Sequence, residues 1–452
     1  MAVTAVATSM AGAINYTFIT DTSADFASVA NSTYFYNKAD KLVRFKDSTG
    51  AVLEIFSASG GASGIFGISN SSGVYTYYAT LTLAMAAAVS GNTIVMFANF
   101  TETGAVTITL KNGVDINGNG YTYTLNNTGG NNAFVVPDSI VTSCKIINIT
   151  IVRSGNTGTT AYCLTTGTNS SGVIDFSGST LRNTGGSAAL NIVSTYEINN
   201  LTAFGVAGGA IKIGTSNAGT RLSYSIGYAT GGGVGIATQN GGDLYYCSGY
   251  SDSGYGIYSN GGTSINCLGV SVSGGGMVNN NFAYNCVGRS NTGVGFECTS
   301  ATVVTNCSGT SGSGIGFRAG SSSITNCYGY SSSSFGVVLT SNVYSANITS
   351  YSAAAPSMWA LNASVRISGG NVYSDWNNAA AYGIRGNGGS IADTIINCSI
   401  RLVNATAPYL FNDAIAATIS MRGNTYRGGA AFAANITQLI TATEDNQGNI
   451  YL

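Results

Sequence analysis

Short apolar stretches alternate with small polar turns along most of the chain, and between residues 230 and 350 this pattern recurs as one phrase. Each copy contains G-x-G, an apolar residue, a turn rich in Ser, Gly or Thr, and then an N-C-x-G anchor. The apolar residue after G-x-G recurs at a nearly constant spacing, at Ile236, Ile257, Met277, Phe296, Phe317 and, in a degenerate copy, Val337. The anchor recurs with the same spacing at Cys247, Cys267, Cys286, Cys307 and Cys327, and then at Ile348. Two independent markers with one period indicate an internal repeat of about 20 residues.

This period favours a parallel β-helix, in which each repeat forms one coil of short strands and turns. Leucine-rich repeats have a similar length but need L-x-x-L-x-L, which is absent, and ankyrin and tetratricopeptide repeats are longer and helical. Successive coils of a β-helix stack at about 4.8 Å, so equivalent residues form columns along the shaft. The sequence therefore predicts an all-β fold with about 20 residues per coil.

The anchor predicts a structural ladder inside the shaft. Free Cys behaves as a small buried hydrophobe, and its exchange with Ile348 is typical of a core position. Asn precedes the anchor at Asn266, Asn285, Asn306 and Asn326, and Gly follows it by two residues. Glycine there indicates a close approach between coils or a turn with positive φ. We expect the cysteines to be packed, unpaired thiols rather than redox or metal groups.

Composition removes several classes of function. The chain has 452 residues, no His, and only 8% charged residues with a net charge of −1. Zero His excludes His-ligated metal sites and Ser-His pairs, and the nine Cys include no C-x-x-C pair, so we expect no metal and no cofactor. A neutral chain gives no reason to expect nucleic acid. No apolar run is long enough to span a bilayer, and the N-terminus lacks the basic region of a signal peptide.

The flanks differ from the repeat and divide the chain into five parts. Residues 1–60 hold the charged run KADKLVRFKD and are expected to form an N-terminal attachment or oligomerisation element. Residues 61–78 are predicted as a linker. Residues 79–120 are predicted as a capping helix, with Leu81, Met85 and Ala88 on one face, followed by the first coils. The shaft then covers residues 121–420, and residues 421–452 form a C-terminal cap or assembly segment.

The helix, "GNTIVMF" and "VTITLKNGVDINGNG" together resemble the opening of the pectate-lyase-like β-helix family. The resemblance covers roughly residues 79–420 and implies a right-handed parallel β-helix. Many members of this family are polysaccharide lyases and hydrolases. A second group comprises bacteriophage tailspikes, tail fibres and other virion appendages, usually trimers attached to the particle through their N-terminal element. The His-free, Gly/Ser/Asn-rich shaft after a charged element looks more like the phage group.

Polysaccharide cleavage requires pairs or clusters of acidic side chains, and the regular shaft does not have them at sequence spacings that bring them together. Hydrolysis needs two carboxylates about 5–9.5 Å apart, and Asp243, Asp252 and Glu297 do not pair in that way. Glu297 does align with Arg318, one repeat further on, which predicts a stacked surface ion pair. No Asp cluster suitable for Ca²⁺ is visible. A site between protomers, or one among Asp375, Asp393 and Asp413, stays open.

Tyrosines give a weaker functional signal. Tyr250 and Tyr330 stand three residues after their anchors and Tyr328 stands directly after Cys327, so strand alternation places some of them on one outer face. Exposed Tyr can stack on sugar rings, which makes these three residues candidates for glycan binding.

We expect a non-enzymatic virion protein of a bacteriophage, a tail-fibre or tailspike-like appendage. It would be a homotrimer, attached to other virion proteins by its N-terminus and contacting host surface polysaccharide. The alternative is a polysaccharide depolymerase, a lyase or glycoside hydrolase, of the same fold. A bacterial surface adhesin or stalk is disfavoured by the missing signal peptide.

Overall fold

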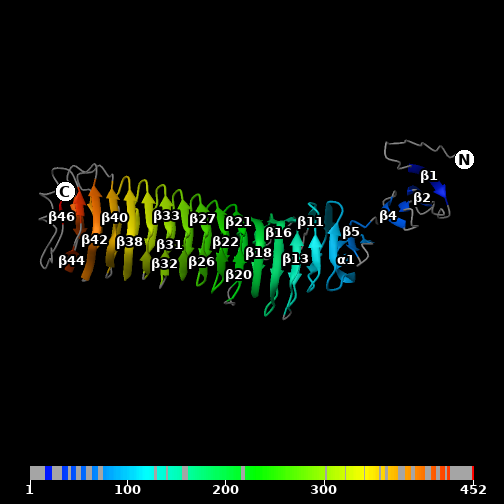
Figure 1. Ribbon diagram of the computed structural model, residues 1–452, viewed down its shortest axis with the longest axis horizontal. Coiled ribbons are helices and arrows are strands. Elements are labelled where there is room, and N and C mark those ends of the chain that lie inside the picture. The colour runs from blue at the N-terminus through cyan, green and yellow to red at the C-terminus, as the bar shows by residue number, and fades with distance from the viewer. Residues whose placement is uncertain are drawn as a thin grey trace.

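The computed structural model shows an elongated all-β shaft whose strands lie side by side along the long axis, from β5 to β46 (Figure 1). It is a parallel β-solenoid of about 12 turns with about 22 residues per turn. The predicted all-β parallel β-helix is therefore confirmed. The structure describes residues 64–69, 75–126, 130–138, 141–154, 161–214, 219–300, 303–320, 322–340, 342–355, 365–374, 397–401 and 425, and further strands by their backbone alone.

Each regular coil contributes three short strands, and each strand pairs in parallel with its equivalent one coil later. In one coil these are β25 (Ile257–Ser259), β26 (Thr263–Ile265) and β27 (Leu268–Ser271). The next coil repeats them as β28 (Met277–Asn279), β29 (Phe282–Tyr284) and β30 (Val287–Ser290). The pairings β25–β28, β26–β29 and β27–β30 are all parallel. The shaft therefore has three sheet faces.

The first face contains, besides β26 and β29, the strands β7 (Thr93–Met96), β10 (Asp115–Asn117), β13 (Cys144–Ile147), β20 (Arg221–Ser223), β23 (Asp243–Tyr245), β32 (Val303–Thr305) and β35 (Ser323–Thr325). The second face contains, besides β27 and β30, the strands β8 (Phe100–Thr103), β11 (Thr122–Asn126), β14 (Thr150–Ser154), β21 (Ile226–Ala229), β24 (Ser248–Ser251), β33 (Ser308–Ser311) and β36 (Tyr328–Ser331). Five long strands continue through both faces: β16 (Ser171–Asn183), β18 (Thr195–Gly205), β38 (Val343–Ser352), β40 (Val365–Ser374) and β42 (Ala392–Leu402).

The third face is a 14-stranded sheet. Besides β25 and β28 it contains β9 (Ile108–Thr109), β12 (Phe134–Val136), β15 (Leu164–Thr166), β17 (Leu190–Ile192), β19 (Ile211–Ile213), β22 (Ile236–Thr238), β31 (Phe296–Cys298), β34 (Phe317–Ala319), β37 (Val337–Leu339), β39 (Met358–Leu361), β41 (Tyr382–Asn387) and β43 (Tyr409–Asp413).

The average coil is longer than the sequence predicts because coils on both sides of the regular part are longer. The coil that leads from Cys144 of β13 to its partner Ile174 is more than half as long again as the coil from Leu268 of β27 to its partner Val287. The strands at both ends of this longer coil still pair in parallel. The period read from residues 230–350 is therefore that of the regular part alone.

The predicted helix is present as α1 (Leu81–Ala87). Thr80 caps its N-terminus, since its Oγ1 accepts a hydrogen bond from the Leu83 amide at 3.2 Å. Leu81 and Met85 are buried in the same core as the first coils, together with Ala88. Only part of residues 61–78 can be a linker, because β5 (Phe66–Ser69) and β6 (Tyr75–Tyr78) form a hairpin. β5 also pairs antiparallel with β7, and this hairpin closes the parallel stack at its first coil.

At the other end, strand pairing passes the predicted boundary at residue 420. β44 (Thr418–Arg422) and β45 (Thr425–Arg427) both pair in parallel with β42, and β46 (Ile450–Tyr451) pairs with β45. A separate four-stranded sheet precedes the shaft: β1 (Tyr16–Thr22), β2 (Thr33–Lys38), β3 (Leu42–Lys46) and β4 (Val52–Ser57). The first two strands are parallel and the others antiparallel. The N-terminal element is thus a β-sheet, and its role in attachment stays a prediction.

The turn between the first and second faces depends on a column of residues with positive φ. Asn266, Asn285, Asn306 and Asn326 have φ between 54° and 56°, and Asn148, Asn200, Asn347 and Asn397 repeat this conformation. The left-handed region is strained for most residues, and Asn tolerates it better than other side chains. Asn285 also donates from Nδ2 to Asn266 Oδ1 at 2.6 Å, which links consecutive coils. This conformation explains why Asn precedes the anchor.

The five anchor cysteines lie in one column next to these asparagines. The residues directly after them are in register (Ser248, Leu268, Val287, Ser308, Tyr328, Thr349), so the anchors stack coil on coil. Cys247, Cys267, Cys286, Cys307, Cys327 and Ile348 are each no more than 3% exposed. All nine cysteines of the chain are buried, free thiols. Cys398 joins the same column through its register with Gly370.

Each anchor thiol also forms hydrogen bonds that a hydrocarbon side chain lacks. Cys286 Sγ lies 3.3 Å from the carbonyl oxygen of Tyr284 and 3.3 Å from that of Ser264 in the coil before. Ser225 occupies the equivalent position in an upstream coil, and its Oγ donates to the Ser223 carbonyl at 2.9 Å. A small donor at this corner therefore satisfies a buried carbonyl beside the left-handed turn.

Two glycine columns let opposite walls of the shaft touch. A Cβ on Gly269 would lie 2.2 Å from the Gly276 oxygen, and one on Gly309 would lie 2.1 Å from the Gly316 oxygen. Neither Gly269 nor Gly309 has positive φ. Of the two reasons expected for this glycine, close approach is therefore the one that applies.

A buried serine column was not predicted. Ser271 Oγ donates to Gly254 O at 2.7 Å and accepts from the Gly274 amide at 2.9 Å. The same pair of bonds recurs at Ser251, Ser290, Ser311 and Ser331. The signal was present as Ser four residues after each anchor Cys. These hydroxyls fix the turn that leads into the third face.

Candidate functional site

The outer side of the second face carries one column of side chains that follows the strand register through eleven coils. In chain order its members are Arg182, Phe204, Tyr228, Tyr250, Val270, Arg289, Thr310, Tyr330, Tyr351, Tyr373 and Arg401. Their strands alternate inward and outward, and every member is at least partly exposed. Six aromatic rings thus share one outer column.

The rings form two stacks. In the first stack, Phe204, Tyr228 and Tyr250 have ring centroids 4.8 and 4.9 Å apart and planes within 11° of parallel. In the second, Tyr330, Tyr351 and Tyr373 are 5.2 and 4.9 Å apart, with planes within 13°. The spacing follows that of the coils.

An arginine covers the outer end of each stack. Arg182 Cζ lies 4.2 Å from the Phe204 centroid, and Arg401 Cζ lies 5.4 Å from that of Tyr373, both within cation–π distance. The inner ends at Tyr250 and Tyr330 are followed instead by Val270 and Thr310, with the exposed Arg289 between them. Tyr250 and Tyr330 are therefore the two stack ends that no arginine covers, each with a smaller side chain next to it in the column.

The predicted glycan-binding residues are consequently not one cluster. Four coil steps separate Tyr250 from Tyr330, about 19 Å at about 4.8 Å per coil. Tyr328 lies outward on the same strand as Tyr330 but in the neighbouring column, with 37% of its surface exposed. Burial and the neighbouring Tyr330 raise the pKa of Tyr328. Phe204 and Tyr228 were missed because the longer coils that join them to Tyr250 do not follow the period of the regular repeat. Tyr351 could have been found, since it stands three residues after the anchor Ile348 and pairs with Tyr330 one coil before.

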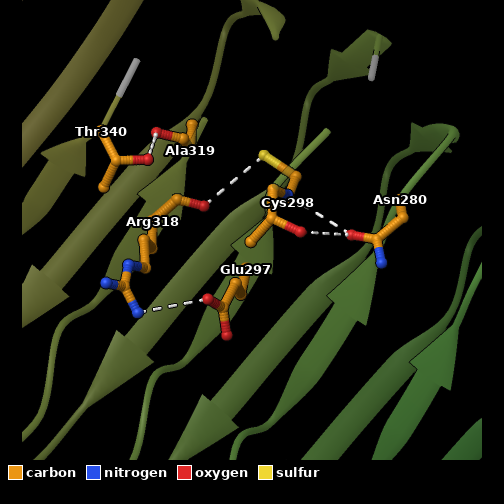
Figure 2. A network of polar contacts seen from close by, with 7 residues as sticks. Asn280, Glu297, Cys298, Arg318, Ala319 and Thr340 are labelled. Atoms are coloured by element: carbon orange, nitrogen blue, oxygen red, sulfur yellow. Dashed lines mark hydrogen bonds and ion pairs between the residues drawn. The ribbon is translucent and has the colours of Figure 1, made fainter. Parts of the chain in front are cut away.

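The ion pair expected on the third face is present. Arg318 Nη1 lies 3.3 Å from Glu297 Oε1, and the two residues pair directly across β31 and β34 (Figure 2). The Glu297 side chain is 14% exposed and that of Arg318 40%. Tyr258 lies two coils before Glu297 in the same column, and its ring centroid is 5.6 Å from that of Tyr255. Burial, and then the negative charge of Glu297, raise the pKa of Tyr255.

Two aspartates of the described shaft accept hydrogen bonds from nearby polar groups. Asp243 Oδ1 accepts from the Thr263 amide at 2.8 Å, and Asp175 Oδ1 accepts from Ser177 Oγ at 2.8 Å. Among the described residues, no group of three or more His, Cys, Asp or Glu could hold a metal ion. Asp375 and the side chains of Asp393 and Asp413 lie outside the described residues. No helix within the described part of the chain is long and apolar enough to cross a membrane.

Comparisons with known proteins assign no family to the chain. No family model matches the chain, and no curated protein matches its sequence. One similar solved structure is the A-module of mannuronan C-5 epimerase AlgE6 from Azotobacter vinelandii. It is 16% identical, covers 82% of this chain and 93% of that one, and has a TM-score of 0.29.

Two further solved structures are similar to a comparable degree. ORF18 of Geobacillus virus E2 is 11% identical, covers 87% of this chain and 71% of that chain, and has a TM-score of 0.24. The catalytic domain of a GH87 α-1,3-glucanase in complex with nigerose is 13% identical, covers 71% of this chain and 62% of that chain, and has a TM-score of 0.26. The neighbours therefore include a phage protein and carbohydrate-acting enzymes. Similarity at this level carries no argument about activity.

Proposed function

We propose that the protein is a structural appendage of a bacteriophage particle, a tail fibre or tailspike-like protein that contacts host surface glycan. The observation that carries this proposal is the combination of a long, continuous shaft with a separate N-terminal sheet, β1–β4. A rod of stacked coils holds two sites far apart at fixed distance, which is the mechanical requirement of an appendage. The N-terminal sheet attaches to other virion proteins, and the distal part faces the host.

The two aromatic stacks are the proposed glycan contact. A pyranose ring binds by laying its C–H face on an aromatic face, while hydroxyls accept or donate at the edge. We assign this contact to Tyr250 and Tyr330, the two stack ends whose column neighbours are the smaller Val270 and Thr310 instead of an arginine. Arg289, midway between them, adds N–H donors for sugar hydroxyls or carboxylates. The span of about 19 Å fits a short oligosaccharide segment rather than a single sugar.

The stacked rings are also rigid, which favours binding. A tyrosine packed on its neighbour loses little further conformational freedom when a ligand binds. Tyr228 and Tyr351 hold Tyr250 and Tyr330 in place, at centroid distances of 4.9 and 5.2 Å.

We propose a homotrimer as the assembled form, with parallel shafts.

The virion assignment is tested on purified particles of the phage that encodes the chain. Mass spectrometry should find the protein in the particles, and antibody-labelled electron microscopy should place it on an appendage. Absence of the chain from purified particles contradicts the proposal. Mass measurement of the isolated protein tests the trimer separately.

The glycan contact is tested with host surface polysaccharide. Tyr250→Leu and Tyr330→Leu should each weaken binding at least tenfold, because each removes the aromatic ring at the end of a stack. Tyr250→Phe keeps the face and should bind nearly as well as wild type. Equal binding by all three variants contradicts the assigned surface. Release of reducing ends or unsaturated sugars from the same polysaccharide would instead favour the depolymerase alternative.

A further inference from the structure

Arg153 is a charged side chain enclosed in the core of the shaft. It lies on β14 at an inward position, stacked between Leu125 of the coil before and Asn183 of the coil after. It is 0% exposed and is the largest of the fully buried side chains among the described residues. Downstream, the same inner column is filled by Gly205, Ala229, Ser251 and Ser271. A guanidinium thus replaces a small residue at this corner.

The guanidinium is only partly satisfied by its surroundings. Arg153 Nε donates to the Asn131 carbonyl at 3.0 Å, and Nη1 donates to Asn183 Oδ1 at 3.4 Å. Nη2 is buried and has no hydrogen-bond acceptor, and the buried hydroxyl of Ser187 has no partner either. Both residues contact Asn183, whose Oδ1 accepts from Arg153 Nη1 and whose Nδ2 donates to the Ser187 carbonyl at 3.1 Å. The two unused donors therefore belong to residues that meet at one buried amide.

No carboxylate of the described residues balances the charge of Arg153. Among the described residues, Cys163 is the ionisable side chain that influences Arg153. The stretches that follow β11 and β14 in the chain, 127–129 (NTG) and 155–160 (GNTGTT), lie outside the described residues and contain no Asp or Glu in their sequence. Arginine does not deprotonate in proteins, so it cannot escape burial by becoming neutral. A buried guanidinium of this kind requires a counter-charge.

Cys163 is not placed to supply that charge as a thiolate. Its Sγ lies 3.0 Å from the Arg182 carbonyl oxygen, a contact that requires the thiol proton between them. Complete burial also raises the pKa of Cys163 to about 12, despite the adjacent guanidinium. No described residue therefore supplies a neutralising charge to Arg153.

We propose that the shaft binds a small monovalent anion, of the size of chloride, at Arg153. The anion accepts hydrogen bonds from Arg153 Nη2 and from the Ser187 hydroxyl, the two unused donors beside Asn183. The site lies inside the second face, away from the aromatic stacks, and is independent of the proposed function. It stabilises the coils around β14 without taking part in glycan binding.

Bromide replaces chloride for the test, because its anomalous scattering identifies it directly. Protein purified and crystallised in sodium bromide should show an anomalous peak in contact with Arg153 Nη2. The melting temperature should rise with chloride or bromide concentration but not with gluconate, which is too large to enter, at equal ionic strength. Arg153→Met, similar in length and neutral, should lose the peak and the halide dependence. Lys145→Met removes an exposed charge from the adjacent strand β13 and should retain both.

Three results would overturn the proposal. The first is a wild-type crystal in bromide with no anomalous peak at Arg153. The second is a melting temperature of the wild type that is the same in bromide and gluconate, a measurement that needs no variant to fold. The third is a bromide peak that survives in Arg153→Met, which would mark an adventitious ion only. Ultraviolet absorbance of a thiolate at neutral pH, lost in Cys163→Ser, would identify Cys163 as the counter-charge instead.

Discussion

Replacing Gly269 with alanine should separate two walls of the shaft. The added Cβ would lie 2.2 Å from the Gly276 carbonyl oxygen and 2.9 Å from Met277 Cβ. Ordinary van der Waals contact begins at 3.4 Å. In a close-packed interior the two backbones must therefore move apart by about 1 Å, although the coils above and below hold them in place. Both walls are backbone, so no flexible side chain can yield.

Overpacking of this kind costs about 3 kcal/mol, the upper part of the usual range, because neither wall can rotate away. A long repeat unfolds locally rather than as one unit, so the effect is best measured by hydrogen exchange. Amides around Gly276 and Met277, which bond to Val294 and Gly295 in the next coil, should exchange roughly a hundredfold faster. Gly232→Ala is the control, since its Cβ would meet nothing within 4 Å. Unchanged exchange in Gly269→Ala would refute the close contact between the walls.

Four further outcomes are expected. Cys286→Ser should change stability by less than about 1 kcal/mol, because Ser225 forms the same bond upstream. Cys286→Val loses the thiol contacts with the Tyr284 and Ser264 carbonyls and should lower the free energy of unfolding by about 1–2 kcal/mol in denaturant unfolding. Asn306→Gly should be tolerated, whereas Asn306→Val should be destabilised by at least about 1 kcal/mol, since φ is 56° there; equal stability of the two would argue against the left-handed turn. Burial raises the pKa of Cys327 from 9.0 to about 11, so with rising pH the thiol loses its proton in the unfolded state first. The free energy of unfolding should therefore be constant below pH 9 and fall by about 3 kcal/mol between pH 9 and 11. Melting measured against pH should show a smaller decline in Cys327→Ala. Arg318→Met should change the free energy of unfolding by no more than about 1 kcal/mol, because the ion pair with Glu297 is partly exposed. A larger loss of stability would show that the pair is more than a surface contact.

The regular coils were predictable because two markers share one period there. Cys and the apolar residue after G-x-G both face inward, and their positions need only stacking at a constant register. The Glu297–Arg318 pair was predictable for the same reason, since the two residues are one coil apart in that region. Where the coil length is constant, equivalent residues of successive repeats therefore align in columns that the sequence predicts.

Three other features could not be predicted from a constant repeat period. The stack of Phe204, Tyr228 and Tyr250 spans coils with longer turns, so only strand pairing reveals its alignment. Strand alternation places Arg153 inward, on the same side of β14 as the buried Ile151, whereas its charge predicts an outward position. The hairpin β5–β6 is too short to be distinguished from a linker by composition. In each case tertiary pairing overrode the local signal.

The stacking of coils is tested most directly by locating the sulfur atoms of the shaft. Anomalous diffraction at long wavelength from crystals of the protein would show each cysteine as a peak. The account predicts that Cys247, Cys267, Cys286, Cys307 and Cys327 form one buried row with steps of about 4.8 Å. Peaks scattered through the molecule, or lying in solvent, would contradict the parallel β-helix and the functions proposed on it.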